Sequence, residues 1–221
     1  NIAKLLIIDQ FGVDEVSDSV FKKLACLPTA DFVFFLSSST LHRFRDHPAI
    51  KQKIEKVGDW YEIHRAALKY YRNLLTSTNN LFLGSFSIKK RSNIYGLIFG
   101  SHHPLGIHKF LQVAWETDEI AGEANFDIER ENIRPGESLL PLEEFRPNKI
   151  REFEHDLEAE LRAGQMKSEL DLIRFCPEAG MTCRHAQPIL KKLKSEGVLD
   201  IDFRVPDIRR IRDPRPVGLT K

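Results

Sequence analysis

The first part of the chain alternates between short apolar runs and a segment with helical spacing. Residues 5–8 (LLII) and 31–36 (DFVFFL) are largely apolar runs of strand length, as expected for strands that a parallel sheet buries on both faces. Apolar positions in residues 17–27 recur with a helical period, and Pro28 follows that segment. A strand, a helix and a strand in this order predict a βαβ unit with two parallel strands.

The middle of the chain predicts helices followed by a pair of antiparallel strands. Residues 41–75 have helical spacing, whereas residues 81–88 and 94–100 are alternating or continuously apolar. The polar turn at residues 89–91 is short enough for an antiparallel hairpin. A further helix is expected at residues 105–116.

The sequence from residue 149 onward predicts three helices and then two short strands. These elements are expected at residues 149–163, 166–175, 184–196, 198–203 and 208–212. Helix, helix, turn, helix and a short hairpin is the order of a winged helix-turn-helix, so we expect this fold for residues 149–221. The preceding residues 119–148 are acidic and contain several prolines, and we interpret them as a linker with little regular structure.

The composition excludes some classes of protein. Hydrophobic residues make up 42% of the chain and charged residues 29%, which excludes an intrinsically disordered tail. The apolar runs are far shorter than the roughly 20 residues of a membrane helix, so we expect no membrane association. The three cysteines, Cys26, Cys176 and Cys183, have no metal-like spacing and follow no secretory signal. This pattern favours a reducing, cytoplasmic environment.

Charge is distributed unevenly along a chain whose net charge is only +1. Residues 116–160 carry fifteen acidic and five basic side chains, whereas residues 184–221 carry ten Lys or Arg and five acids. An acidic middle and a basic end indicate two regions with different roles.

The basic C-terminal region contains the residues that we expect to bind DNA or RNA. In a helix-turn-helix, the start of the recognition helix contacts base edges, and flanking basic residues contact phosphates. The residues assigned to these roles are Arg184, His185, Gln187, Lys191, Lys192, Lys194, Arg204, Arg209, Arg210 and Arg212. Such modules also dock onto proteins, with the lysines as a solvated face, so nucleic-acid and protein partners both stay open.

A short motif follows the first predicted strand. Asp9, Gln10, Phe11 and Gly12 form a turn at the carboxyl end of that strand, where strands of a doubly wound sheet line a ligand crevice. The motif resembles the fourth motif of Rossmann-like methyltransferases, in which a carboxylate holds a substrate amine for attack on an electrophilic methyl group. We assign the four residues a catalytic role. The alternative is that Asp9 only satisfies backbone donors in the turn.

Further stretches extend the resemblance to one family. Residues 8–12, 32–36, 95–106 (YGLIFGSHHPLG) and 180–182 (GMT) are similar to the three-Cys-motif partner protein family. The resemblance covers nearly the whole chain. It implies an α/β fold in which residues 1–118 form the C-terminal half of a Rossmann-like, methyltransferase-like sheet, followed after the linker by the winged helix. It also implies a partner that carries the three-cysteine motif and resembles radical S-adenosylmethionine enzymes.

The cofactor implied by this resemblance requires a further element of the fold. Methyltransferases bind S-adenosylmethionine at a Gly-rich turn after their first strand, and no such turn precedes Asp9. Gln10 also stands where the family usually has proline. We therefore expect S-adenosylmethionine to bind only together with a missing N-terminal half of the same protein. Without that half, the chain is expected to be a non-catalytic adaptor that binds DNA, RNA or protein, and enzymatic activity is left open.

Two other groups of polar residues favour structural roles. His102, His103 and His108 are not spaced to place two imidazoles on one helical face, which favours a crevice-lining loop over a metal site. Residues 37–40, near His42, lack the Gly-x-Ser-x-Gly turn of many serine hydrolases. We interpret them as helix-capping residues.

Overall fold

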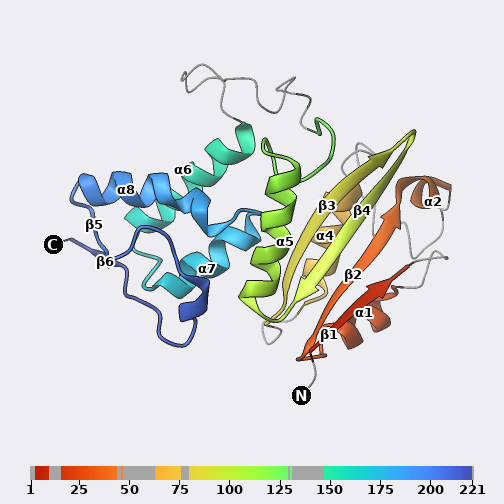
Figure 1. Cartoon of the computed structure of the whole chain (residues 1–221), viewed down its shortest axis with the longest axis horizontal. Helices are drawn as coiled ribbons and strands as arrows, with labels where there is room; N and C mark the ends of the chain where they lie inside the picture. The colour runs from red at the N-terminus through yellow and green to blue at the C-terminus, as the bar shows by residue number, and fades with distance from the viewer. Residues whose placement is uncertain are drawn as a thin grey trace.

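A mixed four-stranded sheet is followed by a helical C-terminal unit (Figure 1). The computed structural model describes residues 3–9, 16–43, 46, 63–75, 80–128, 130 and 147–220. Within these residues, the structure confirms that the chain is an α/β protein with a mixed sheet.

The sheet has the strand order β1-β2-β4-β3. The strands are β1 (Lys4–Ile8), β2 (Ala30–Ser37), β3 (Phe82–Lys90) and β4 (Asn93–Ser101). β1 and β2 are parallel, β3 and β4 form an antiparallel hairpin, and β4 also pairs antiparallel with β2. The predicted parallel pair and the predicted hairpin are therefore confirmed. The hairpin is longer than predicted because Lys89 and Lys90 continue β3, and Arg91 forms the turn with a φ of 58°.

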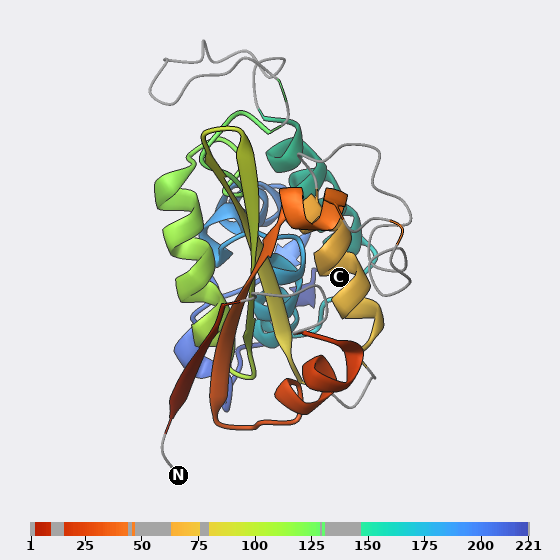
Figure 2. The same ribbon diagram turned by 90° about the vertical axis from the view of Figure 1, so that its right-hand side faces the viewer.

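Helices cover the two faces of the sheet to different extents (Figure 2). They are α1 (Asp18–Leu24), α2 (Ser38–Arg43), α4 (Ile63–Asn73) and α5 (Pro104–Thr117). α1 and α4 share one core with the sheet, in which the Tyr71 ring lies 4.7 Å from Phe21 and 5.0 Å from Phe34. α5 covers β3 and β4 on the other face, where Phe110 stacks on Phe99 at 5.0 Å. Gly84 permits this close approach, because a Cβ there would lie 2.7 Å from Ile107.

The prediction that the first strand is buried on both faces is wrong. Leu6 and Ile8 pack against the core formed with α1 and α4. Leu5 and Ile7 point to the opposite face because side chains alternate along a strand, and they are 60% and 67% exposed. β1 is the edge strand of the described sheet, and α5 lies over β3 and β4 rather than over β1.

The C-terminal unit consists of three helices, two 3₁₀ turns and a two-stranded sheet. In chain order these are α6 (Asn148–Arg162), α7 (Glu169–Glu178), η3 (Cys183–Ala186), α8 (Gln187–Ser195), β5 (Leu199–Asp200), η4 (Ile208–Arg210) and β6 (Gly218–Leu219). The helices pack their apolar faces into one core, to which α6 contributes Phe153, Leu157 and Leu161. Ser168 begins α7 with a capping box that it shares with Asp171, which satisfies backbone donors that a helix start leaves free.

Several predicted boundaries in this unit are wrong. The predicted third helix is divided into η3 and α8, and the helix before it begins and ends three residues later than expected. The predicted strand at residues 208–212 is instead the turn η4, because the Asp207 side chain accepts a hydrogen bond from the Arg209 amide. β5 pairs with residues 218–219 instead.

The first part of the predicted acidic linker is ordered. The Asp118 carboxylate accepts hydrogen bonds of 3.0–3.2 Å from four backbone amides, those of Ile120, Ala121, Glu123 and Ala124. Ala124 also forms a β-bridge with Ser87 of β3. Residues 118–124 therefore form a capped loop against the sheet, while residues 131–146 lie outside the described part of the chain.

α5 joins the sheet to the C-terminal unit (Figure 1). Trp115, near its end, is buried in the C-terminal core, and its Nε1 donates to the Gly180 carbonyl at 3.0 Å. Gly122 packs against the same ring, and its φ of +60° and its closeness to Trp115 both disfavour a side chain. α5 thus packs against β3 and β4 through Phe110 and contributes Trp115 to the C-terminal core.

Candidate functional site

The predicted catalytic turn is only partly described. Asp9 follows β1 and is exposed, and it lines none of the cavities described below. Gln10, Phe11 and Gly12 lie outside the described residues. The structure therefore places Asp9 at the expected strand end, and the cavities given for the described residues do not include it.

Some of the predicted nucleic-acid residues line a groove beside α8. The groove has a volume of about 590 Å³ and lies between α8 and residues 202–204. Gln187, Lys191, Lys194 and Arg204 line it. The Lys194 ammonium donates to the Ile201 carbonyl at 2.5 Å. Lys191 and Arg204 are exposed and form no hydrogen bond or ion pair among the described side chains.

Lys192 is neutralised within the unit. Its ammonium lies 2.8 Å from Glu158 of α6, which also pairs with Arg162. These two hydrogen bonds hold the pKa of Glu158 below its usual value. Lys192 was predicted to contact nucleic acid, but this ion pair makes its ammonium less available to an external anion.

The arginines after residue 208 lie apart from the α8 groove. They belong to η4 and the residues after it, a turn that contacts α5, whereas α8 contacts α6, η3 and β5. Arg209 forms two 3.0 Å hydrogen bonds with Asp207, and Arg210 lies 2.8 Å from Asp213. Arg212 is exposed. Arg209 and Arg210 are therefore paired with neighbouring carboxylates, and none of the three arginines lines the α8 groove.

The start of the predicted recognition helix packs against α5. Arg184 and His185 line a cavity of about 370 Å³ together with the acidic Glu116 and Glu119. The His185 ring lies 4.2 Å from the Trp115 ring, and burial lowers the pKa of the imidazole. Its Nδ1 contacts the hydroxyl of Thr182 at 3.0 Å. His185 is thus part of an intrachain contact rather than a free base-reading group.

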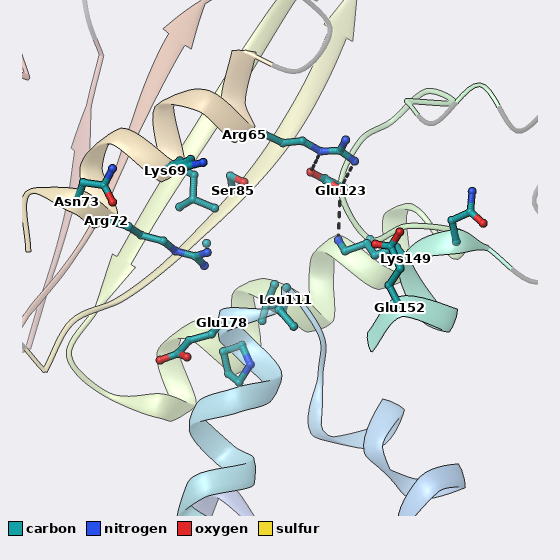
Figure 3. Close-up of a pocket in the computed structure, with 17 residues that line it drawn as sticks. Arg65, Lys69, Arg72, Asn73, Ser85, Leu111, Glu123, Lys149, Glu152 and Glu178 are labelled. Carbon is teal, nitrogen blue, oxygen red and sulfur yellow. Dashed lines mark hydrogen bonds and ion pairs between the residues drawn. The ribbon is translucent and has the colours of Figure 1, made fainter. Parts of the chain in front are cut away.

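A larger cleft separates the sheet from the C-terminal unit (Figure 3). Its volume is about 660 Å³, and its walls come from α4, β3, α5, α6 and residues 177–180. Arg65, Lys69 and Arg72 of α4 lie on one wall, because residues four and three apart share one face of a helix. Lys149 lies on the opposite wall.

Glu123 holds one end of this cleft together. Its carboxylate accepts hydrogen bonds from Arg65 at 2.6 and 2.8 Å and lies 2.9 Å from Nε2 of His64. Lys149 lies 3.4 Å from the second oxygen. Burial raises the pKa of Glu123, but the hydrogen bonds from Arg65 and His64 and the charge of Lys149 outweigh burial and hold the pKa far below its usual value. Glu123 is therefore a charged carboxylate that joins α4 to α6.

The basic stripe of α4 was missed by the sequence reasoning. The signal was present, since Arg65, Lys69 and Arg72 have the spacing i, i+4, i+7. Like charges at these spacings destabilise an isolated helix, so such a stripe indicates a role outside the helix. Among the described residues, no three His, Cys, Asp or Glu side chains form a group that could hold a metal ion.

Comparisons of the chain with protein-family models, curated proteins and solved structures found no match. Within the described ranges, every helix is too short or too polar to cross a bilayer.

Proposed function

We propose that the chain is a nucleic-acid-binding adaptor, and that its C-terminal unit binds duplex DNA in the groove beside α8. The observation that carries this proposal is the groove itself, which Lys191, Lys194 and Arg204 line together with Gln187. Lysine and arginine neutralise phosphates, and the counterions released on binding supply sequence-independent affinity.

The order of elements supports a winged-helix arrangement for this unit. α6, α7 and the η3–α8 segment precede the β5–β6 pair, and Ser168 adds a β-bridge to Pro216 beside that pair. In helix-turn-helix proteins the second helix of the motif enters the major groove. By this analogy α8 contacts DNA, and residues 202–204 flank it.

The proposed contact is with phosphates rather than base edges. Arg184 and His185 line the cavity next to α5, and Lys192 pairs with Glu158. Of the residues predicted to read bases, Gln187 is the one that lines the groove. We therefore expect weak discrimination between DNA sequences and an affinity that depends strongly on salt.

A salt titration of the whole chain with mixed-sequence duplexes tests the proposal. With two or three phosphate contacts, log affinity should fall with log salt at a slope of about −2 to −3. The double variant Lys191→Glu/Arg204→Glu should weaken binding to all duplexes alike. Lys22→Glu, the same charge reversal at an exposed position of α1, should change affinity much less. Absence of binding at low salt, or an equal effect of both variants, would contradict a DNA-binding groove.

A methyltransferase-like role is the second candidate. The order of a parallel pair, helices, an antiparallel pair and a final helix supports the resemblance to the C-terminal half of that fold. The exposed Leu5 and Ile7 on the edge strand support it too, since helices cover both faces of a complete doubly wound sheet. In this proposal, a preceding half of the protein supplies S-adenosylmethionine binding, Asp9 lies beside the reaction site, and a three-Cys-motif protein is the partner. We favour the adaptor because Asp9 lines none of the cavities described above.

A further inference from the structure

The cleft between the sheet and the C-terminal unit contains two cations that form no ion pair with a described residue. Arg65 and Lys149 are engaged by Glu123. Lys69 and Arg72 line the same cleft and form no ion pair with any described residue. The carboxylates of Glu152 and Glu178 complete the charged lining.

Among these residues, Arg72 gives the clearest indication that the cleft can bind an anion. Its guanidinium is half-buried, and its one hydrogen bond within the described structure goes to the Leu83 carbonyl at 3.1 Å. A guanidinium has five N–H donors, so most of its donors stay free for an anion. Burial lowers the pKa of Arg72, and the negative charge of Glu178 opposes that effect.

The two remaining carboxylates, Glu152 and Glu178, form no ion pair with Lys69 or Arg72. Glu152 and Glu178 belong to exposed residues, whereas Arg72 is half-buried in the wall. Exposed charges keep their hydration and are screened by salt. A phosphate inside the cleft would instead form charge-assisted hydrogen bonds with Arg72 and Lys69.

The rest of the lining is suited to an organic group attached to the anion. Leu68, Leu111, Pro177 and Ala179 give the cleft an apolar surface. The Ser85 hydroxyl, which has no hydrogen-bond partner among the described residues, also lines the cleft (Figure 3). A volume of about 660 Å³ falls within the range of about 300–1,000 Å³ typical of small-molecule sites.

We propose that this cleft binds a small phosphorylated molecule of nucleotide size, with Lys69 and Arg72 on the phosphate and the apolar wall against the organic group. The site is separate from the α8 groove. Its ligand joins α4 to the end of α7 and the two residues after it, and therefore the sheet to the C-terminal unit.

Calorimetric titration of the whole chain tests this site with three probes: adenosine 5′-monophosphate, inorganic phosphate and adenosine. The nucleotide should bind more tightly than either part alone. Lys69→Gln and Arg72→Gln should each weaken nucleotide binding about tenfold or more, as expected for loss of a charge-assisted hydrogen bond. Glu178→Gln should tighten binding several-fold, because it removes a carboxylate from the cleft.

Two control variants test whether a loss of nucleotide binding is specific to this cleft. Lys22→Gln removes the same charge from α1, outside the cleft, and should leave the affinity unchanged. Lys69 is exposed, so its variant should fold even if the Arg72 variant does not. Lys191→Glu/Arg204→Glu should bind the nucleotide like the unmodified chain, which separates this site from the DNA proposal.

Three results would overturn the proposal. They are no nucleotide binding at millimolar concentration, equal binding by Lys69→Gln and Lys22→Gln, and an affinity for adenosine equal to that for its monophosphate. Equal affinity for inorganic phosphate and the nucleotide would overturn the role assigned to the apolar wall.

Discussion

Replacing Glu123 by Gln should destabilise the fold more than any exposed charge substitution. The change keeps the size of the side chain but removes the charge that faces Arg65, His64 and Lys149. The Glu123 side chain is 10% exposed. Removing one partner of a buried ion pair typically costs about 3–5 kcal/mol, because it leaves the other charge unpaired.

The partial exposure of the partners reduces this cost. The side chains of Arg65 and Lys149 are 32% and 20% exposed, so water can solvate part of the charge that Glu123 leaves. His64, in contrast, is fully buried. We therefore expect the free energy of unfolding to fall by about 2–3 kcal/mol at pH 7.

The loss should depend on pH in a defined direction. The pKa of Glu123 in the folded chain lies below its usual value, so the folded state favours the ionised form. This stabilisation is fully present above the unfolded pKa of about 4.3. The stabilisation decreases as the pH falls from about 4.3 toward the pKa of Glu123 in the folded chain. The stability difference between the unmodified chain and Glu123→Gln should therefore narrow below about pH 4.

Urea unfolding followed by circular dichroism at pH 7, 5, 4 and 3 measures both effects. Glu119→Gln is the matched control, because Glu119 is exposed in the same loop. It should change the free energy of unfolding by less than about 0.5 kcal/mol. Equal midpoints for the two variants at pH 7, or a difference that widens at low pH, would refute the role assigned to Glu123.

Two further predictions concern the backbone and the cofactor. Gly122→Ala should destabilise the chain by about 1–3 kcal/mol more than Gly197→Ala. Both glycines have a positive φ, but only a Cβ at Gly122 would meet the Trp115 ring. Equal melting temperatures of the two variants would contradict this prediction. The chain of residues 1–221 should show no S-adenosylmethionine binding by calorimetry, because none of the cavities given for the described residues includes Asp9. A micromolar dissociation constant would contradict this prediction.

The sequence by itself determined the elements whose signals are local. The apolar runs at residues 31–36 and 94–100 predict strands, and both strands are present. The helical period of residues 149–163 predicts α6 to within one residue at each end. Hydrophobic periodicity is sufficient there because each element buries one continuous face.

A side-chain hydrogen bond and a long-range strand pairing account for the boundaries that the sequence did not predict. Residues 208–212 are predicted as a short strand, but the Asp207 side chain accepts a hydrogen bond from the Arg209 amide and favours a turn. Side chains of Asp commonly compete with strand pairing in this way. β5 pairs with residues 218–219, far along the chain, and periodicity contains no information on such a partner.

Only the tertiary structure decided which charged residues are available for binding. The sequence groups Lys191 and Lys192 by type, but Lys192 forms an ion pair with Glu158, which lies 34 residues away along the chain. The same holds for the cleft, where Glu123 lies 58 residues from Arg65 along the chain. Ion pairing depends on distance in space and on burial, and these are properties of the packed chain.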